Sequence, residues 1–436
     1  MDTSESGTQS GIQPPEDTAA SPPPPRRGWR RWAMDTRPLA IPAYRRLWTS
    51  TIVTSVGSQL TAVAVPKQIY DITGSSAWVG AASLAGLLPL IVFALWGGAV
   101  ADAMDRRKLL LITNCGIAVT SLLFWLQAVT GLESVAALMV LLAMQQAFWG
   151  LNAPARTASI ARLVPEGQLP AANALGSTVM QTGQVIGPLL AGALIPVIGL
   201  PELYLIDALA LCVTVWAVYR LPALPPLAGA AARRAGVREI VAGFRYISMH
   251  KVLLLSFVAD IIAMVFGMPR ALFPQLAAET YGSWGEGLAL GLLFAAIPVG
   301  AVLGGLFSGT FSRARRHGWM VIGAVVGWGA AVAGFGLSRN LWVAVVFLAA
   351  AGVADMVSMV FRGAILLSAA TDEMRGRMQG VFTVVVAGGP RLADVLHGTM
   401  GSVFGPRAAV AGGGLLVVAV MLLLAAAVPA LRRYRI

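Results

Sequence analysis

The sequence predicts an all-α membrane protein with about twelve transmembrane helices in two pseudo-symmetric six-helix bundles. Three observations support this fold class: an apolar composition, regularly repeated apolar segments, and a second half that matches the first. Hydrophobic residues make up 57% of the chain and charged residues 12%. A spanning helix needs ~20 apolar residues to cross ~30 Å of hydrocarbon. The segments of this length are 47–70, 77–100, 109–130, 135–157, 168–195, 203–220, 252–278, 288–311, 319–337, 342–367, 378–402 and 408–429.

Basic residues gather in alternate loops and give the chain a formal net charge of +12. Cytoplasmic loops of membrane proteins carry an excess of Lys and Arg, so this pattern indicates a membrane surface and not a nucleic-acid partner. We therefore expect a multi-pass protein of the inner (plasma) membrane, with the lipid bilayer as a partner. Both termini are expected in the cytoplasm, which requires an even number of spans. The loops on the opposite side hold mostly acids, namely Asp71, Glu133, Glu202, Glu279 and Glu286.

Shifts in composition divide the chain into four parts. Residues 1–40 are rich in Ser, Pro and Gly and are predicted to form a disordered cytoplasmic tail. Residues 41–221 and 249–436 each contain half of the predicted spans and are expected to form the two bundles. The Pro-, Ala- and Arg-rich residues 222–248 are predicted to be a cytoplasmic linker between them.

The two predicted bundles are copies of one pattern. Glycines, prolines and arginines of the first half recur 206 to 208 residues later, with an offset that drifts slowly along the chain. Such an offset indicates parallel repeats about an axis along the membrane normal. The copies differ in charge, because Gly309 stands where the first half has Asp102, and Asp394 where it has Pro188. The matched pairs include Pro66 and Pro274, Gly74 and Gly282, Gly97 and Gly304, Arg106 and Arg313, Arg156 and Arg362, and Gly183 and Gly389.

The first predicted span is unusually polar. A helix that faces lipid on all sides would not carry so many hydroxyl and amide groups, so at least one face is predicted to line a polar cavity. These residues are Thr49, Ser50, Thr51, Thr54, Ser55, Ser58, Gln59 and Thr61.

A charged turn separates the second and third predicted spans. Residues 102–108 hold two acids and three bases. Because charges are costly in hydrocarbon, the turn must lie at the membrane surface, and its bases place it in the cytoplasm. The charges of this turn by themselves are explained by a turn that is exposed to water.

The same turn resembles the loop signature of the major facilitator superfamily. The matching residues are Gly98, Asp102, Arg106 and Arg107, whereas Ala103 and Asp105 depart from the usual pattern. The resemblance implies the major facilitator fold and a conformational latch on the cytoplasmic side. In that family the aspartate lies against the N-terminus of a helix in the other half, where the helix dipole favours negative charge.

A second motif lies in the fifth predicted span and consists of Gly183, Gly187, Pro188 and Gly192. Glycines spaced by four share one helix face and admit the backbone of a neighbour, and Pro188 removes a backbone donor and is expected to bend the helix. A purely structural role, close helix packing together with a kink, is sufficient to explain the motif. It also resembles the motif of drug:proton antiporters in the same superfamily, which implies export.

Charged residues inside the spans are candidates for function by default. Asp260 lies nine residues past Lys251, which is ~14 Å at ~1.5 Å per residue. Asp355 and Arg362 are seven residues apart, so both are expected to point from one helix face into a cavity. We assign Asp260 and Asp355 to proton carrying.

Arg391, Asp394 and His397 are spaced by three and form one stripe on the eleventh predicted span. A transport role and a buried structural ion pair are both open for this stripe. Arg270 lies near the outer end of the seventh span. We expect Arg270 and Arg362 to attract an anionic substrate, because guanidinium groups bind anionic oxygens well.

Other segments resemble the branch of the superfamily that contains enterobactin exporters and macrolide-efflux pumps. They include residues 63–69, 268–274 and 294–301. The resemblance implies a secondary active exporter of a small organic molecule, driven by proton antiport, and a siderophore of the enterobactin type is the first expectation. The alternatives are a macrolide or multidrug efflux pump and a non-transporting membrane sensor with the same fold.

An enzyme is not expected. The chain has three histidines, His250, His317 and His397, which are far apart in the sequence and give no clustered metal or catalytic set. No nucleotide-binding loop is present. We therefore expect no metal and no cofactor. We also expect a monomer, with H⁺ as the coupling ion.

Overall fold

The structure is a computed structural model that describes residues 34–226, 245–311, 314, 316–369, 372–429 and 432. Contacts join Thr36–Ile436 into one compact unit, and the description below concerns this unit. Most of the predicted tail, residues 227–244 of the predicted linker and Arg313 of the repeat lie outside the described residues. At the end of the predicted tail, Arg37–Ala40 form a short 3-10 helix.

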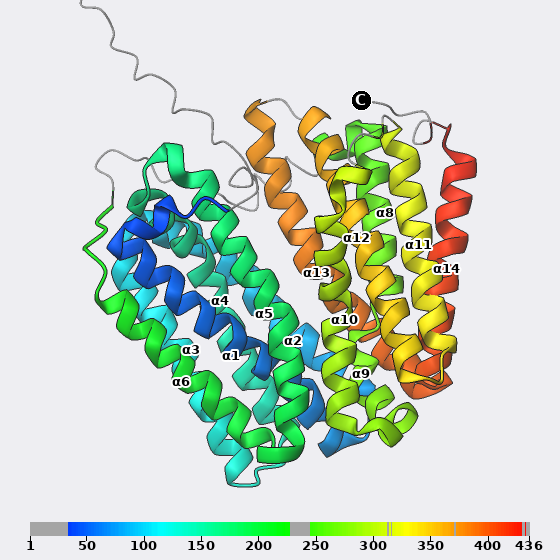
Figure 1. Cartoon of the computed structure of the whole chain (residues 1–436), viewed down its shortest axis with the longest axis horizontal. Coiled ribbons are helices and arrows are strands. Elements are labelled where there is room, and N and C mark those ends of the chain that lie inside the picture. Colours follow the sequence, from blue (N-terminus) through cyan, green and yellow to red (C-terminus); the bar gives the residue numbers. More distant parts are fainter. Residues whose placement is uncertain are drawn as a thin grey trace, which may run out of the picture. The chain divides into compact units, whose positions relative to one another are not determined.

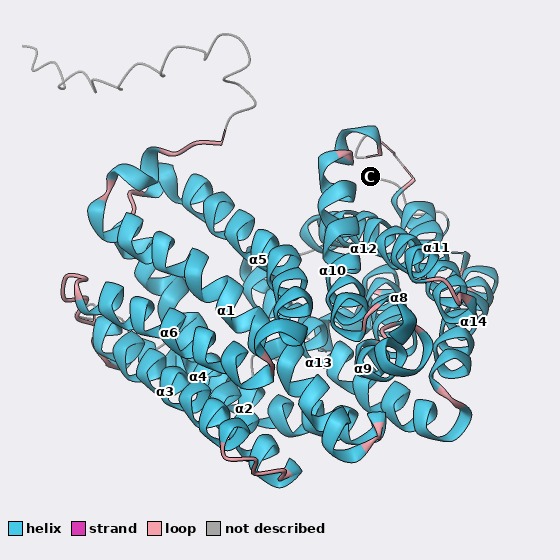
Figure 2. Cartoon of the chain, turned by 60° about the horizontal axis from the view of Figure 1, so that its bottom comes forward, coloured by secondary structure: helices cyan, strands magenta, loops and turns pink. Residues whose placement is uncertain are grey.

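The described residues fold into helices and loops, with no strand among them (Figure 2). We call α1–α6 the first half and α8–α14 the second half. The first half contains α1 (Pro42–Thr73), α2 (Ser76–Ala103), α3 (Arg106–Val129), α4 (Val135–Leu163), α5 (Leu169–Ile198) and α6 (Leu200–Tyr219). The second half contains α8 (Lys251–Gly267), α9 (Phe273–Gln275), α10 (Glu286–Leu306), α11 (His317–Leu337), α12 (Leu341–Ala369), α13 (Asp372–Phe404) and α14 (Pro406–Ala427).

The helix ends follow from local sequence. Helix α1 ends at Gly74, whose φ of 62° suits the left-handed position after a helix. Ser75 and Asp105 then cap the first turns of α2 and α3 by accepting hydrogen bonds from Ala77 and Arg107 backbone N–H groups.

The seventh predicted span is interrupted. Helix α8 ends at Gly267, and the chain continues through a 3-10 turn (Arg270–Leu272), α9 and a π-helical turn (Leu276–Thr280). Pro269 explains the break, because proline lacks a backbone donor and disfavours helical geometry in the residue before it. Helix α5, by contrast, continues through Pro188 to Ile198.

The helix contacts repeat between the halves. In the first half α2 packs on α4, α1 on α6, and α3 on α6; in the second half α10 packs on α12, α8 on α14, and α11 on α14. The halves meet through α2 with α13 and through α5 with α10 (Figure 1). Exchanging equivalent helices turns one of these contacts into the other, as the sequence repeat predicts. The predicted all-α fold of two pseudo-symmetric six-helix bundles is thus confirmed.

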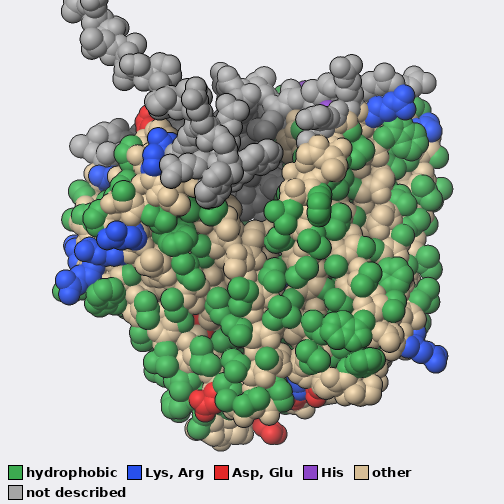
Figure 3. Space-filling model, in the orientation of Figure 1, with side chains coloured by type: hydrophobic (Ala, Val, Ile, Leu, Met, Phe, Trp, Pro, Cys, Tyr) green, Lys and Arg blue, Asp and Glu red, His purple; other side chains and the backbone are tan. Residues whose placement is uncertain are grey.

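Ten helical segments of the described residues are long and apolar enough to cross a membrane. Helices α1 and α13 are also long, at 32 and 33 residues, but they are more polar and are not among these ten. Both line the cavity described below, which explains their polarity. In Figure 3 hydrophobic side chains cover much of the visible face, acidic side chains gather at the lower edge, and most basic ones lie on the left flank and at the upper right. A broad hydrophobic face is expected for a surface in contact with lipid.

Candidate substrate cavity

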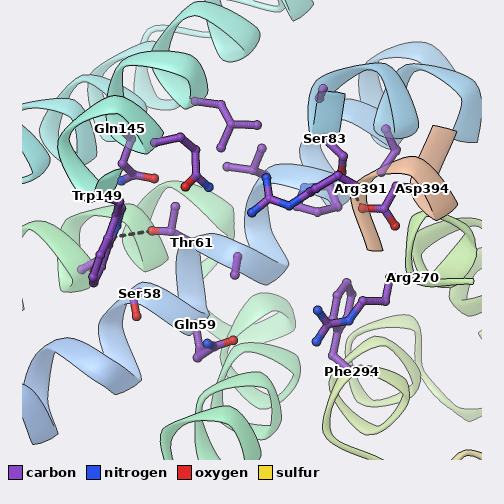
Figure 4. A pocket seen from close by; sticks show the side chains of 18 of the residues that line it. Ser58, Gln59, Thr61, Ser83, Gln145, Trp149, Arg270, Phe294, Arg391 and Asp394 are labelled. Carbon is purple, nitrogen blue, oxygen red and sulfur yellow. Dashed lines mark hydrogen bonds between the residues drawn. The ribbon is translucent and has the colours of Figure 1, made fainter. Parts of the chain in front are cut away.

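A cavity of ≈ 410 Å³ lies where the two halves face each other. Helices α1–α6 line one wall; the Arg270–Leu272 turn, α10 and α13 line the other. Figure 4 shows side chains of both walls pointing into the space. The polar residues Ser58, Gln59 and Thr61 of α1 belong to the lining, in agreement with the predicted polar face of the first span.

The wall of the second half carries two arginines and one aspartate. The break after Gly267 places Arg270 on the cavity, and Arg391 and Asp394 lie three residues apart on one face of α13. Asp394 is buried, and its Oδ2 accepts a 2.7 Å hydrogen bond from Ser83 Oγ of α2. The structure therefore brings together three of the predicted site residues from two elements.

Neither Arg270 nor Arg391 forms a hydrogen bond or an ion pair with another described residue. Arg391 also reaches across to the first half, where its Nη1 lies 3.3 Å from the position of a Cβ built on Gly86. Two guanidinium groups with one carboxylate give this wall a net positive charge. Such a wall is suited to an anionic ligand with paired oxygen acceptors.

Amide side chains and aromatic rings also line the cavity. The first half contributes four glutamines and Trp149, and the second half contributes Phe294, which packs edge-on against Phe273 at 5.1 Å between ring centroids. Aromatic faces bind flat apolar rings, and a few amides fix their orientation. The glutamines are Gln59, Gln145, Gln146 and Gln184.

Asp207 of α6 lies on the wall of the first half and is 1% exposed. Its Oδ2 accepts hydrogen bonds from Thr61 Oγ1 (2.7 Å) and Ser121 Oγ (2.9 Å), while Oδ1 has no hydrogen-bond partner among the described residues. Our sequence analysis did not select this residue, although an acid inside a span is the signal that could have identified it.

We call the end of the unit where α1 begins and α6 ends the linker end, and the opposite end the far end. At the far end, polar contacts close the cavity between the halves. Lys67 Nζ of α1 lies 2.9 Å from Glu286 Oε1 of α10 and also contacts Asp71. In addition, Tyr70 donates a 2.7 Å hydrogen bond to Glu279, and Ser76 donates a 2.8 Å bond to Gln275.

The motif at 183–192 serves two interfaces. A Cβ built on Gly183 would lie 2.8 Å from Ser55 Oγ, and Gly187 packs more closely still on Gln59, both on α1. Gly192 instead faces the other half, where a Cβ would lie 2.8 Å from Gly291 Cα of α10. The backbone oxygen of Pro188 lies 2.7 Å from a Cβ built on Gly291. The motif therefore packs α5 against α1 and closes the far end against α10.

The charged turn 102–108 is held by its own half. Asp102 Oδ1 lies 3.7 Å from Arg106 Nη2, and Arg106 also donates to the Ala158 backbone oxygen (3.2 Å). Arg107 donates to Tyr219 O (2.5 Å). No atom of the described residues lies within 4 Å of a Cβ built on Gly98, whereas Gly97 packs on α4. The described residues contain no contact from Asp102 to the second half; the side chains of 372–384 at the start of α13 are not described.

Asp260, Asp355 and Arg362 lie together inside the second half and not on the substrate cavity. Arg362 of α12 forms an ion pair with Asp260 of α8, and its Nη2 lies 3.8 Å from Asp355 Oδ1. Asp260 and Arg362 are both buried. Our expectation that Arg362 and Asp355 point into a cavity thus differs from the structure, because the neighbouring α8 supplies a buried acid that neutralises the arginine.

His397, the third member of the stripe on α13, faces a different neighbour. Its Nε2 lies 3.0 Å from the backbone oxygen of Phe266 near the end of α8. The stripe is therefore divided, with Arg391 and Asp394 on the cavity and His397 packed inside the second half.

Two helical halves around a central polar cavity define a membrane transporter. A family model described as transmembrane secretion effector matches residues 33–434. The chain belongs to this family of the major facilitator superfamily and is therefore a multi-pass membrane transporter and not an enzyme.

Relatives of known name match nearly the whole chain. The enterobactin exporter EntS of Shigella boydii serotype 18 (strain CDC 3083-94 / BS512) is 31% identical over 402 residues, covering 90% of this chain and 94% of the relative. EntS of Citrobacter koseri (strain ATCC BAA-895 / CDC 4225-83 / SGSC4696) is 30% identical over 397 residues, with the same coverage.

Solved structures of low sequence identity share the fold. The nucleoside transporter NupG has a TM-score of 0.73 at 14% identity, covering 90% of this chain and 100% of that chain. A D-xylose–proton symporter has a TM-score of 0.68 at 13% identity, covering 91% of this chain and 100% of that chain. At these identities the likeness establishes the major facilitator fold.

Proposed function

We propose that the chain exports an anionic aromatic siderophore of the enterobactin type across the inner membrane in exchange for protons. The observation that carries this proposal is the pair Arg270 and Arg391, two guanidinium groups on the substrate cavity that form no hydrogen bond or close ion pair with a described residue and outnumber the one carboxylate of their wall, Asp394. Trp149 and Phe294 would pack on the rings of such a ligand. The relatives named enterobactin exporters support this choice of substrate.

In this proposal the linker end faces the cytoplasm, because the basic loops lie there. The closed far end would keep the cavity shut toward the outside while substrate enters from the cytoplasm. Asp102 would engage the second half only after the halves rock and the cytoplasmic side closes. Protonation must then stabilise one of the two conformations, cytoplasm-facing or outward-facing, and substrate the other. A ligand that binds both conformations equally cannot drive the exchange.

The test uses a bacterial strain that synthesises enterobactin but lacks its own exporter. Expression of the full chain is expected to restore enterobactin in the medium, and a protonophore is expected to abolish this secretion. Normal membrane insertion without secretion would refute the proposed substrate. Reduced susceptibility to a macrolide in the same strain, without secretion, would instead support the macrolide-efflux alternative.

A further inference from the structure

We propose that Asp207 is the proton-binding residue of the substrate cavity, a deduction that rests on the proposed proton exchange. The carboxyl group lies on the cavity wall, is 1% exposed, and has one oxygen to which none of the described residues donates a hydrogen bond. An ionised carboxylate in such a place is unfavourable unless a cation compensates its charge. A proton removes this cost without any rearrangement of the helices.

No described cation compensates Asp207. Helix α6 packs on α1, α3 and α5. The groups of these helices that contact the carboxyl are neutral: Thr61 and Gly57 on α1, and Ser121 on α3. Gln145 of α4 donates to Ser121 and extends this neutral shell by one layer.

The other charged groups of these helices lie away from Asp207. Lys67 and Asp71 of α1 belong to the far-end contacts, and the bases 106–108 of α3 lie at the linker end. Helix α5 carries no charged residue. On α6 itself, Glu202 lies in the first turn, and Tyr204 donates to Gln68.

Other acids are less suited to bind the exchanged proton. Asp394 shares its wall with Arg270 and Arg391, and these cations compensate a carboxylate charge. Asp260 is bound by Arg362 and does not line the substrate cavity. Asp207 is thus the lining acid that has no lining arginine on its own wall, and it is positioned to exchange a proton with water in the cavity.

The chain offers a matched control for this assignment. Two hydrogen-bonded contacts join α1 to α6 seven residues apart: Thr61 to Asp207, and Thr54 to Thr214. Both threonines are buried, but Thr54 does not contact the acid. Replacing either threonine by valine removes one hydroxyl from the same helix interface, and only the change at 61 alters the surroundings of Asp207.

The test records infrared pH-difference spectra of the full-length protein in lipid, which need no substrate. Wild-type protein is expected to show a protonated-carboxyl C=O band that titrates with pH and is lost in Asp207→Asn. Thr61→Val is expected to move the midpoint of this band upward by about one pH unit, since the lost hydroxyl stabilised the charged form. Thr54→Val is expected to leave the midpoint unchanged.

Transport supplies the second readout. In proteoliposomes, Asp207→Asn is expected to lose the acceleration of enterobactin efflux by a pH gradient while keeping enterobactin exchange at equal pH. A titrating band that persists in Asp207→Asn, or full gradient dependence in this variant, would overturn the assignment. If the wild-type protein does not transport enterobactin, the proposed substrate fails, but the infrared band still decides whether Asp207 binds the proton.

Discussion

The ammonium group of Lys67 on α1 and the carboxylate of Glu286 on α10 form a 2.9 Å ion pair that joins the two halves at the far end. The same ammonium contacts Asp71 of the first half. One cation therefore holds two acids, one from each half, and separating the halves would break this arrangement. We therefore expect this arrangement to stabilise the state in which the far end is closed.

Replacing Lys67 is expected to loosen the far end. Lys67→Gln leaves Asp71 and Glu286 facing each other without a cation, so the population open at the far end should rise about fivefold, or ~1 kcal/mol. Spin labels at the exposed loop residues Leu132 and Arg339 would report the opening by pulsed electron resonance. Lys108→Gln, an equal change at the linker end, should leave the distances unaltered.

The same distances should depend on pH. Burial raises the pKa of Asp71, and Glu286 adds to this effect while Lys67 opposes it. The closed far end therefore binds a proton more tightly than an open, hydrated one, so acidification should favour closure and a rise in pH through the raised pKa should favour opening. The pH dependence should be weaker in Asp71→Asn, and an unchanged titration in this variant would exclude Asp71 as its origin.

Arg391→Gln is expected to weaken substrate binding. Loss of one charge-assisted hydrogen bond costs ~1.5–3 kcal/mol, which corresponds to a rise in Kd of about tenfold or more. Calorimetric titration of purified protein with enterobactin would measure the change. The control is Arg339→Gln, which removes an exposed arginine at the far end; equal losses in both variants would argue against the cavity as the binding site.

Asp102→Asn separates a conformational role from a structural one. Asp102 is 35% exposed and lies 3.7 Å from Arg106, so the thermal unfolding temperature should be almost unchanged. Export should nevertheless fall, because the substituted side chain could no longer hold the cytoplasmic side closed. Asp105→Ala tests the opposite expectation, a lower unfolding temperature, since Asp105 caps α3 and also accepts from the Leu224 backbone N–H. Undiminished export in Asp102→Asn would exclude the latch.

Asp260→Asn is expected to destabilise the second half. It leaves Arg362 buried with Asp355 at 3.8 Å as its remaining described acid, and breaking a buried ion pair costs ~3–5 kcal/mol. Thermal unfolding should therefore shift to lower temperature, and the double variant Asp260→Asn/Arg362→Gln should recover part of the loss. Normal stability combined with lost proton dependence would instead return Asp260 to the role of proton carrier.

The lining of the cavity shows which features could be predicted from local sequence patterns and which could not. The polar face of the first span could be predicted, because hydroxyl and amide groups facing lipid are costly wherever the helix lies. The stripe of Arg391, Asp394 and His397 could be placed on one helix face for the same local reason. Its division between the cavity and Phe266 could not be predicted, because that depends on how α13 is rotated against α8.

The sequence by itself determined the membrane fold, the helices and the repeat, because the length and polarity of a span are local properties of consecutive residues. The tertiary structure alone decided which charges meet. Asp260 and Arg362 are 102 residues apart and pair only because α8 packs on α12, while no cation among the described residues pairs with Asp207. Ion pairing depends on the rotation and separation of neighbouring helices, and these are set by close contacts such as Gly192 against Gly291.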